Sequence, residues 1–324
     1  MKVFSSLFLC IFATTDKEKD MEKFELTILG CGSALPTTRH FATSQVLNVR
    51  EKLYMIDCGE GAQLQMRRSR LKFSHLNHVF ISHLHGDLCF GLIGLISTFG
   101  LLGRTTPLHV HAPENFGPML QHMLDFFCKG LDFKVEFHPV DTTSHALIHE
   151  DRSVSVYSIP LRHRIASCGY LFREKELLPH IRRDMIDFYR IPLCEINNIK
   201  NGKDWITEEG QTIPYTRLTT PALPPRSYAY CSDTIYLPKL SSLVEGVDLL
   251  FHEATFLHED LQRAQETFHT TALQAATLAK DSHVKALCIG HFSARYEEES
   301  VLLDEAKSVF EHTILAKENL NIKI

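Results

Sequence analysis

The sequence predicts an α/β layered fold, in which strands and helices alternate along the chain. Short apolar runs of strand length recur throughout, and stretches with a helical spacing of apolar residues lie between them. The predicted strands are 24–30, 52–59, 78–82, 108–113, 154–160, 228–233, 247–254 and 285–291, and the clearest predicted helices are 61–70, 117–127 and 270–281. Because the two kinds of segment alternate, helices packed on sheets are the expected architecture.

One stretch, from about 174 to 226, breaks this alternation. It is rich in charged residues and prolines, and it contains the only tryptophan, Trp205. Such a composition is less typical of a core segment than of a loop-rich insertion. We therefore expect an inserted arm here.

The composition is that of a globular protein with a sizeable core. The chain has 324 residues, of which 44% are hydrophobic and 23% charged, and its formal net charge at pH 7 is −5. A nucleic-acid partner would therefore need local basic patches. The nine cysteines are scattered without a CxxC pair, which favours reduced thiols in a cytoplasmic protein over a disulfide framework.

The first 20 residues differ from the rest of the chain. A lysine and an apolar stretch from Val3 to Ala13 resemble a weak secretory signal. Met21 then opens a segment, MEKFELTILGCGSALP, with the pattern of a domain start. Because the cysteines favour a reducing compartment, we expect 1–20 to be a non-native or mis-assigned extension and 21–324 to be the folded domain. No run of 18 apolar residues occurs elsewhere, so no membrane span is expected.

Candidate metal ligands stand at or just after the ends of several predicted strands. They are His83, His163, Asp233 and His291. A single histidine after a strand is usually a surface or core residue, and the chain has 19. Strand ends in an α/β sheet converge on one edge, however, so together these side chains predict a metal pocket.

The segment HLHGD, residues 83–87, is a stronger signal. Alternating positions of extended or turn chain point to the same side, so His83, His85 and Asp87 would face one point. Imidazole and carboxylate together suit zinc, with manganese or iron less favoured. This segment therefore predicts a metal site.

The motif SHLHGD is similar to the signature of the metallo-β-lactamase fold superfamily. The chain further resembles ribonuclease Z, the tRNA 3′-processing endonuclease, in ISHLHGDLCFGLIGLI, LGCGSALPTTRHFATS, IDCGEGAQLQM, CSDT, HEATF and HTTALQAA, which occur in the same order. The resemblance covers about residue 21 to the end. It implies a four-layer αββα sandwich with an inserted tRNA-binding arm, precursor tRNA as the substrate, and a homodimer.

The resemblance also implies two zinc ions per subunit. The implied ligands of the first are His83, His85 and His163, those of the second are Asp87 and His291, and Asp233 would bridge both. Asp87 would also accept the proton of the attacking water, and His269 would lie near the scissile phosphate. The implied products are a tRNA with a 3′-hydroxyl and a trailer with a 5′-phosphate.

Several residues beside these motifs keep open roles. Glu60 and Glu253 are candidates for hydrogen-bonding the liganding imidazoles, and His252 matches a family histidine expected one step from the metal. Asp57 is equally suited to a role at the site and to a structural role, in which it would turn the chain before the glycine-rich CGEG. His269 also begins an HTT segment whose threonines would cap the following helix.

Leu88 is the one departure from the family pattern HGDH, in which the final histidine binds the second zinc. Leucine cannot coordinate a metal, so the second ion would keep only Asp87, Asp233 and His291. Three ligands plus water still hold zinc in catalytic sites. We therefore expect a weakened second site and lower activity.

Basic clusters that could bind phosphates occur at 67–70, at 182–183 and at Lys200 with Lys203. On a helix, 67–70 is more typical of a solvated face. The PTTRH loop, 36–40, resembles a family loop at the mouth of the active site and is equally compatible with an ordinary proline turn.

Two other functions are compatible with the motifs. One is another hydrolase of the same fold, acting on a small phosphodiester or thioester. The other is a non-catalytic tRNA-binding paralogue whose site has decayed at Leu88. The inserted arm and HTTALQAA favour the tRNA endonuclease over the first, and the filled ligand positions favour it over the second.

Overall fold

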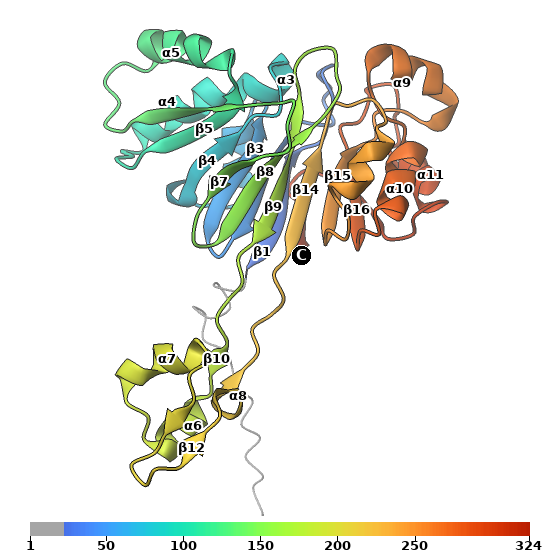
Figure 1. The fold of residues 1–324 in the computed structure, drawn as a ribbon. Coiled ribbons are helices and arrows are strands. Elements are labelled where there is room, and N and C mark those ends of the chain that lie inside the picture. Colours follow the sequence, from blue (N-terminus) through green and yellow to red (C-terminus); the bar gives the residue numbers. More distant parts are fainter. Residues whose placement is uncertain (1–22) are drawn as a thin grey trace, which may run out of the picture.

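The structure is a computed structural model that describes residues 23–324. Two seven-stranded sheets lie face to face, and helices cover the outer face of each (Figure 1). The expected extension at 1–20 lies outside the described residues. Within residues 23–324, no helix has both the length and the apolar character needed to cross a membrane.

The first sheet has the order β18-β1-β2-β3-β4-β5-β6. Its strands are β1 (Phe24–Gly30), β2 (Ser44–Val49), β3 (Lys52–Cys58), β4 (Leu76–Phe80), β5 (Leu108–Pro113), β6 (Val135–Val140) and β18 (Asn321–Lys323). The nearby helices are α2 (Ala62–Arg68), α3 (Gly86–Cys89), α4 (Gly91–Leu101) and α5 (Phe116–Phe127), with a 3₁₀ turn η1 (Phe73–His75). Strands β3 to β6 are parallel, so their carboxyl ends meet at one edge.

The second sheet has the order β17-β16-β15-β14-β9-β8-β7. Its strands are β7 (Leu147–Glu150), β8 (Val154–Pro160), β9 (Cys168–Glu174), β14 (Ser227–Cys231), β15 (Leu249–Glu253), β16 (Ala286–Gly290) and β17 (Thr313–Leu315). The accompanying helices are α9 (Leu261–Thr267), α10 (Ala272–Asp281) and α11 (Ser300–Lys307), with 3₁₀ turns η3 (Pro238–Ser242) and η4 (His258–Asp260). Strands β14 to β17 are parallel.

Apolar side chains fill the space between the sheets and the space under the helices. Large aromatic residues dominate the layer between the sheets, among them Tyr54, Phe80, Tyr170, Phe172 and Tyr230, all essentially inaccessible. A separate cluster joins the first sheet to α2, α4 and α5. Burial of one such side chain contributes roughly 2 kcal/mol, so these layers hold the strand ends in place.

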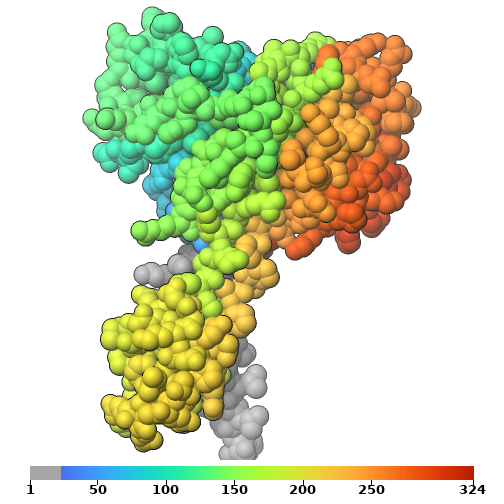
Figure 2. Space-filling view, viewed as in Figure 1, coloured from blue at the N-terminus to red at the C-terminus, as the bar shows by residue number. Residues whose placement is uncertain are grey.

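Residues 180–220 pack around a small core of their own, well away from the sheets (Figure 2). This core contains Ile191, Ile199, Ile213 and Leu218, with Trp205 packed against it. The elements of this part are β10 (His180–Ile181), α6 (Arg183–Tyr189), η2 (Leu193–Glu195), α7 (Ile196–Lys200), β11 (Trp205–Ile206), β12 (Thr212–Ile213), α8 (Tyr215–Leu218) and β13 (Thr219–Thr220).

Two chain segments connect this part to the body, one after β9 and one before β14 (Figure 1). An ion-pair cluster lies where they leave the sheet. The buried carboxylate of Glu174 accepts hydrogen bonds from Arg50 at 3.1 Å and Arg226 at 2.9 Å. Because these three residues come from distant parts of the chain, the cluster fixes the base of both connections.

Every segment predicted as a strand or helix overlaps an observed element of that kind, which confirms the α/β prediction. Strand β9 and helix α4 were not predicted. In α4, the residues GLIGLISTFGL are so uniformly apolar that no polar face marks a helix.

Candidate metal centre

The structure brings the predicted ligands together at one edge of the sandwich. His83 and His85 lie between β4 and α3, His163 follows β8, Asp233 follows β14, and His291 follows β16. Ligand atoms of His83, His85, His163 and Asp233 all lie within 4.8 Å of one another. We refer to these four residues as the first ligand group.

The spacing within the first ligand group suits a metal ion. His83 Nε2 lies 3.0 Å from His85 Nδ1 and 3.6 Å from Asp233 Oδ2. His163 Nε2 lies 3.9 Å from the same carboxylate oxygen. Around a tetrahedral zinc ion with Zn–N distances near 2.0–2.1 Å, ligand atoms are about 3.3 Å apart. Three imidazoles and a carboxylate at these distances therefore fit zinc.

Hydrogen bonds to the Nδ1 atoms set the tautomers of His83 and His163. The Ser82 hydroxyl donates to Asp57 Oδ2, so its oxygen accepts from His83 Nδ1 at 3.1 Å. His163 Nδ1 donates to the carbonyl of Phe268 at 3.0 Å. Both arrangements leave Nε2 unprotonated and directed at the centre, which is the form that binds a metal.

Asp57, whose role the sequence left open, is fully buried and accepts three hydrogen bonds. Their donors are the Ser82 amide at 2.7 Å, the Ser82 hydroxyl at 2.9 Å and Tyr230 at 2.5 Å. Asp57 therefore orients the chain at the start of the HLHGD segment rather than facing the centre.

The residues implied for the second zinc are less compactly arranged. We call Asp87, Asp233 and His291 the second ligand group. His291 Nε2 lies 3.2 Å from Asp233 Oδ2, and its Nδ1 donates to Thr43, whose hydroxyl donates in turn to Gly32. Among residues 23–324, however, the residue that lies within 4.8 Å of both Asp233 and His291 is His269, and Asp87 is not part of that cluster.

Asp87 nevertheless has the character of a ligand. Its Oδ2 is buried and makes no hydrogen bond to any described residue. Burial raises the pKa of this carboxyl, while His291 lowers it. An unpaired buried carboxylate oxygen is costly unless a cation or water satisfies it. The neighbouring Leu88 is fully buried in α3 and offers no ligand atom.

His269 is held at the centre by Glu253. Its Nδ1 donates to the fully buried Glu253 carboxylate at 2.9 Å. Burial alone would lower the pKa of His269, but the Glu253 carboxylate outweighs burial and raises it. The same carboxylate accepts from the Thr234 amide at 2.7 Å and the Thr270 amide at 3.1 Å. Glu253 therefore positions His269, whereas the sequence led us to expect it beside one of the liganding imidazoles.

The other role expected of the HTT segment is also present. The Thr271 hydroxyl accepts from the Gln274 amide, and the Gln274 side chain accepts from the Thr271 amide. This capping box starts α10, so the threonine caps the helix while His269 faces the ligand groups.

Opposite charges face one another at the centre. Burial alone would lower the pKa of His291, but Asp233 outweighs it and raises that pKa to about 9. Burial likewise would raise the pKa of Asp233, and His291 and His83 instead hold it well below its usual range. Burial lowers the pKa of His83 to about 3. A metal ion would therefore displace a proton from His291 on binding.

Several of these residues have unusual backbone conformations. Asp57, Asp233 and His291 have φ values of 55°, 50° and 62°. Residues other than glycine seldom adopt this left-handed region, and such strain clusters at functional sites. Asp57 is the last residue but one of β3, Asp233 lies two residues after β14, and His291 directly follows β16.

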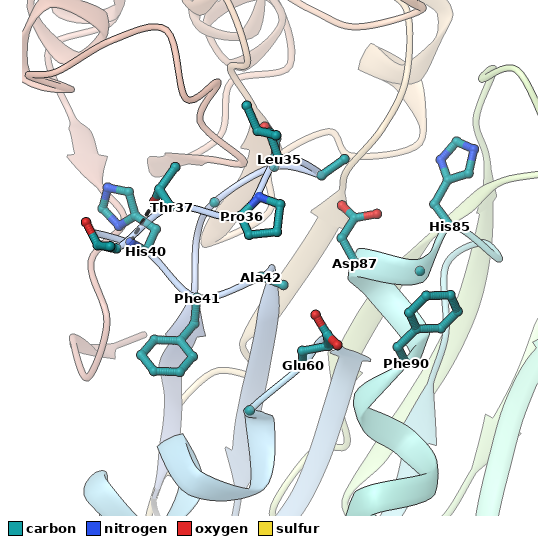
Figure 3. Close-up of a pocket in the computed structure, with 16 residues that line it drawn as sticks. Leu35, Pro36, Thr37, His40, Phe41, Ala42, Glu60, His85, Asp87 and Phe90 are labelled. Carbon is teal, nitrogen blue, oxygen red and sulfur yellow. Dashed lines mark hydrogen bonds between the residues drawn. The ribbon is translucent and has the colours of Figure 1, made fainter.

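Two further predicted residues lie outside the ligand groups. His252 is buried and donates from Nδ1 to the backbone carbonyl of Glu253 at 2.8 Å. Glu60 is exposed on the wall of the neighbouring cleft and does not support an imidazole (Figure 3). Thr43, which orients His291, was missed, although it lies within one of the segments that carried the resemblance.

A cleft of about 940 Å³ opens beside the centre (Figure 3). His85, Asp87 and Phe90 line one side, and the loop 36–40 lines the other together with Phe41 (Figure 3). Phe90 is 63% exposed. The PTTRH loop is thus at the mouth of the centre, and the apolar walls offer surfaces on which bases could stack.

Comparison with solved structures identifies the class of protein. The metallo-β-lactamase fold protein YhfI from Bacillus subtilis matches with a TM-score of 0.65 and 16% identity, over 94% of this chain and 100% of that one. Human tRNase Z, short form, matches with a TM-score of 0.66 and 24% identity, over 92% and 98%. A family model described as anti-Pycsar protein Apyc1 matches residues 24–175. The fold is therefore the metallo-β-lactamase fold.

Comparison of sequences identifies the family. The ribonuclease Z of Bacteroides fragilis is 64% identical over 304 residues, which are 94% of this chain and 100% of the relative. The chain belongs to the ribonuclease Z family, and it is an endoribonuclease.

Proposed function

We propose that this protein removes the 3′ trailer from precursor tRNA in a zinc-dependent reaction. The products would be a tRNA with a 3′-hydroxyl and a trailer with a 5′-phosphate. The observation that supports this most directly is the convergence of His83, His85, His163 and Asp233 within 4.8 Å at the edge of the sandwich. We further propose that the enzyme acts in the cytoplasm, as its scattered cysteines suggest, and as a homodimer, as its family resemblance implies.

The first ligand group would hold one zinc ion, and the second ligand group would hold another, with Asp233 shared between them. A bound zinc ion lowers the pKa of a coordinated water from 15.7 to about 7, which makes hydroxide available at neutral pH. His163 and His83 keep their Nε2 atoms free for this role because their Nδ1 atoms donate elsewhere.

Asp87 and His269 would move protons in the reaction. Asp87 has a buried oxygen without a hydrogen-bond partner among the described residues, so it is available to orient the attacking water and accept its proton. His269 carries a proton on Nδ1 for Glu253, and its raised pKa favours a second proton on Nε2. That proton is available to the phosphate or to the leaving oxygen.

The spacing of the ligand atoms supports unequal affinity at the two zinc sites. The first ligand group is compact, whereas Asp87 stands apart from Asp233 and His291, and Leu88 supplies no further ligand. We infer that the second zinc is bound more weakly than the first and that activity depends on zinc concentration.

The arm, residues 174–226, would bind the tRNA away from the cleavage site. It carries Arg182, Arg183, Lys200 and Lys203, and it also exposes Phe188. Arg182 and Lys203 lie near Asp184 and Glu195, at 2.7 and 3.5 Å, so part of this charge is locally balanced. Arg68 of the 67–70 cluster lies over the Phe41 ring at 5.4 Å, close to the cleft, where it could contact a phosphate.

The test is cleavage of a 3′-extended precursor tRNA with added zinc or manganese, in parallel with a chromogenic phosphodiester. We expect a single cut at the base of the trailer and a 5′-phosphate on the released fragment. Turnover of the small ester alone would instead favour a general phosphodiesterase. Binding of the precursor without cleavage would favour a non-catalytic tRNA-binding protein.

A further inference from the structure

A second concentration of histidines lies between the two sheets, on the strands themselves rather than at their carboxyl ends. Its members are His78 of β4, His109 and His111 of β5, Glu136 and His138 of β6, and His149 of β7. We call this set the histidine layer. None of its members contributes to the metal centre described above.

The strand alternation explains how these polar side chains come to face inward. On β5, Leu108, Val110 and Ala112 pack toward the helices, so His109 and His111 point to the other face, toward the second sheet. The strand register then aligns them with their neighbours. His109 pairs with His78 and Glu136, and His111 pairs with Phe80 and His138. The interior of a sandwich is normally apolar. The presence of six ionisable side chains between the two sheets therefore suggests that they have a function.

Three imidazoles of the layer converge from both sheets. One ring nitrogen from each of His78, His111 and His149 lies within 4.8 Å of the others. His78 Nδ1 is 3.3 Å from His111 Nε2, and the rings of His78 and His149 are 4.1 Å apart between centroids. His149 comes from the edge strand of the second sheet, so this triad joins the two sheets.

Hydrogen bonding within the protein leaves this triad incomplete. His111 is only 2% exposed; its Nε2 faces His78, and its other ring nitrogen, Nδ1, makes no hydrogen bond to any residue between 23 and 324. The same holds for the buried Nε2 of His149. Buried polar atoms of a native protein are nearly always satisfied, so such orphans point to a missing partner. Water or a metal ion could supply it.

The surroundings favour a metal ion because they keep the imidazoles neutral and oriented. Burial lowers the pKa of His78 to about 3 and that of His111 to about 2, and neutral imidazole is the form that coordinates metals. The Phe80 ring stacks on His111 at 4.4 Å, and Tyr54 stacks on His78 at 5.7 Å. These aromatic contacts hold the rings in place.

The other half of the layer provides a path from solvent. His109, Glu136 and His138 are only partly buried, and their ligand atoms also lie within 4.8 Å of one another. His109 Nδ1 is 3.0 Å from His138 Nε2 and 3.3 Å from the Glu136 carboxylate. The His109 ring stacks on His78 at 4.7 Å, so this trio is in direct contact with the triad, of which only His111 is fully buried.

We propose that His78, His111 and His149 bind a zinc ion at a site separate from the catalytic centre, with His109, Glu136 and His138 along the route of entry. An all-imidazole site of this kind suits a borderline divalent ion and is unsuited to Mg²⁺ or Ca²⁺. Because its ligands come from both sheets, the ion would cross-link the sandwich and stabilise it.

The test measures zinc bound to the full chain after equilibration with Zn²⁺ and removal of free metal. Variants His149→Gln and His78→Gln/His149→Gln would be compared with the wild type. The matched control is His122→Gln, on α5 at the opposite face of the first sheet. We expect both layer variants to lose about one equivalent of zinc per chain, with precursor-tRNA cleavage unchanged and the control identical to the wild type. Circular dichroism would establish that the variants are folded.

Anomalous scattering at the zinc edge locates the ion in wild-type crystals. A peak among the three imidazoles supports the proposal, whatever the catalytic centre contains. Equal zinc content in folded variant and wild type, or a histidine layer without an anomalous peak at saturating zinc, would overturn it. In that case the layer is a stack of neutral, hydrogen-bonded imidazoles. If a variant does not fold, the scattering experiment decides alone.

Discussion

The two ligand groups share Asp233 but differ in how completely the chain has assembled them. In the first ligand group, every ligand atom lies within 4.8 Å of the others before any metal is considered. In the second ligand group, Asp87 stands apart, and the position next to it is occupied by the buried Leu88. The first ligand group is therefore preorganised for a metal ion, whereas the second ligand group would depend on the metal to bring its ligands together. Because the two ligand groups share Asp233, their contributions can be distinguished only by substituting residues that belong to one group and not to the other.

Asp233→Ala should produce the largest effect, because it removes the carboxylate common to both groups. Loss of metal-based stabilisation of the transition state costs about 4 kcal/mol, so we expect kcat to fall about 10³-fold or more. Zinc content should fall as well. The matched control is Asp125→Asn, a carboxylate on the outer helix α5. Cleavage within tenfold of the wild type would mean that Asp233 holds neither ion.

His269→Gln should rank next, with kcat lower by about 10²-fold, because it removes a proton donor while leaving both ligand groups in place. Glu253→Gln should lose about 10-fold through disorientation of His269. Zinc content should stay unchanged in both variants. If the pH–rate profile kept its shape in His269→Gln, the proton-transfer role of this residue would be wrong.

The substitution Leu88→His directly tests whether the second ligand group binds zinc weakly because a ligand is missing. A restored imidazole should tighten the second zinc by at least about tenfold and raise cleavage at limiting zinc. Leu88→Ala is the control, because it removes the isobutyl group without adding a ligand. If Leu88→Ala raised activity as much as Leu88→His, exclusion of water rather than a missing ligand would explain the difference. If neither changed zinc affinity, the second site would not be weakened.

The sequence predicted the candidate ligands of both groups better than the residues that support them. Apolar runs identified β4, β8, β14 and β16, and convergence of strand ends then brought His83, His163, Asp233 and His291 to one edge. Their hydrogen-bond partners could not be predicted. Thr43 is distant from His291 in the chain and Phe268 from His163, and only the folded topology brings each pair together.

The histidine layer marks another limit of sequence reasoning. The segment LHVHAP alternates histidines with apolar residues. His109 and His111 must therefore lie on the same face of β5. The sequence does not show which face this is, or that His149 approaches it from the second sheet. Both depend on how the two sheets pack against each other. Alternation within a strand is local, whereas the approach of β7 is set by tertiary packing.

The smallest predicted effect concerns the loop that supports the second ligand group. His40 lies at the end of the PTTRH loop, just before Thr43, and its ring nitrogens lie 3.2 Å from Glu318 and 2.9 Å from Glu299. The hydrogen bond to Glu318 is the main cause of a raised His40 pKa. Burial would raise the pKa of Glu318, but the hydrogen bond and charge of His40, together with backbone hydrogen bonds, outweigh it and lower that pKa.

Both shifts define the pH range in which this contact stabilises the fold. A raised histidine pKa contributes stability in full below about pH 6.5, and the contribution is lost as pH rises through the folded-state value. A lowered glutamate pKa contributes above about pH 4.3 and is lost as pH falls. The contact should therefore be strongest between these limits, at about 1 kcal/mol, since both groups are near the surface.

Chemical denaturation of wild type and His40→Gln from pH 4 to 9 measures this contribution. We expect the difference in unfolding free energy to peak near pH 5 to 6 and to shrink toward pH 9. If the loop also holds Thr43 against His291, His40→Gln should weaken the second zinc and leave the first unchanged. A variant that lost both ions equally would show that the loop supports the whole edge, and the two ligand groups would then not be independently stabilised.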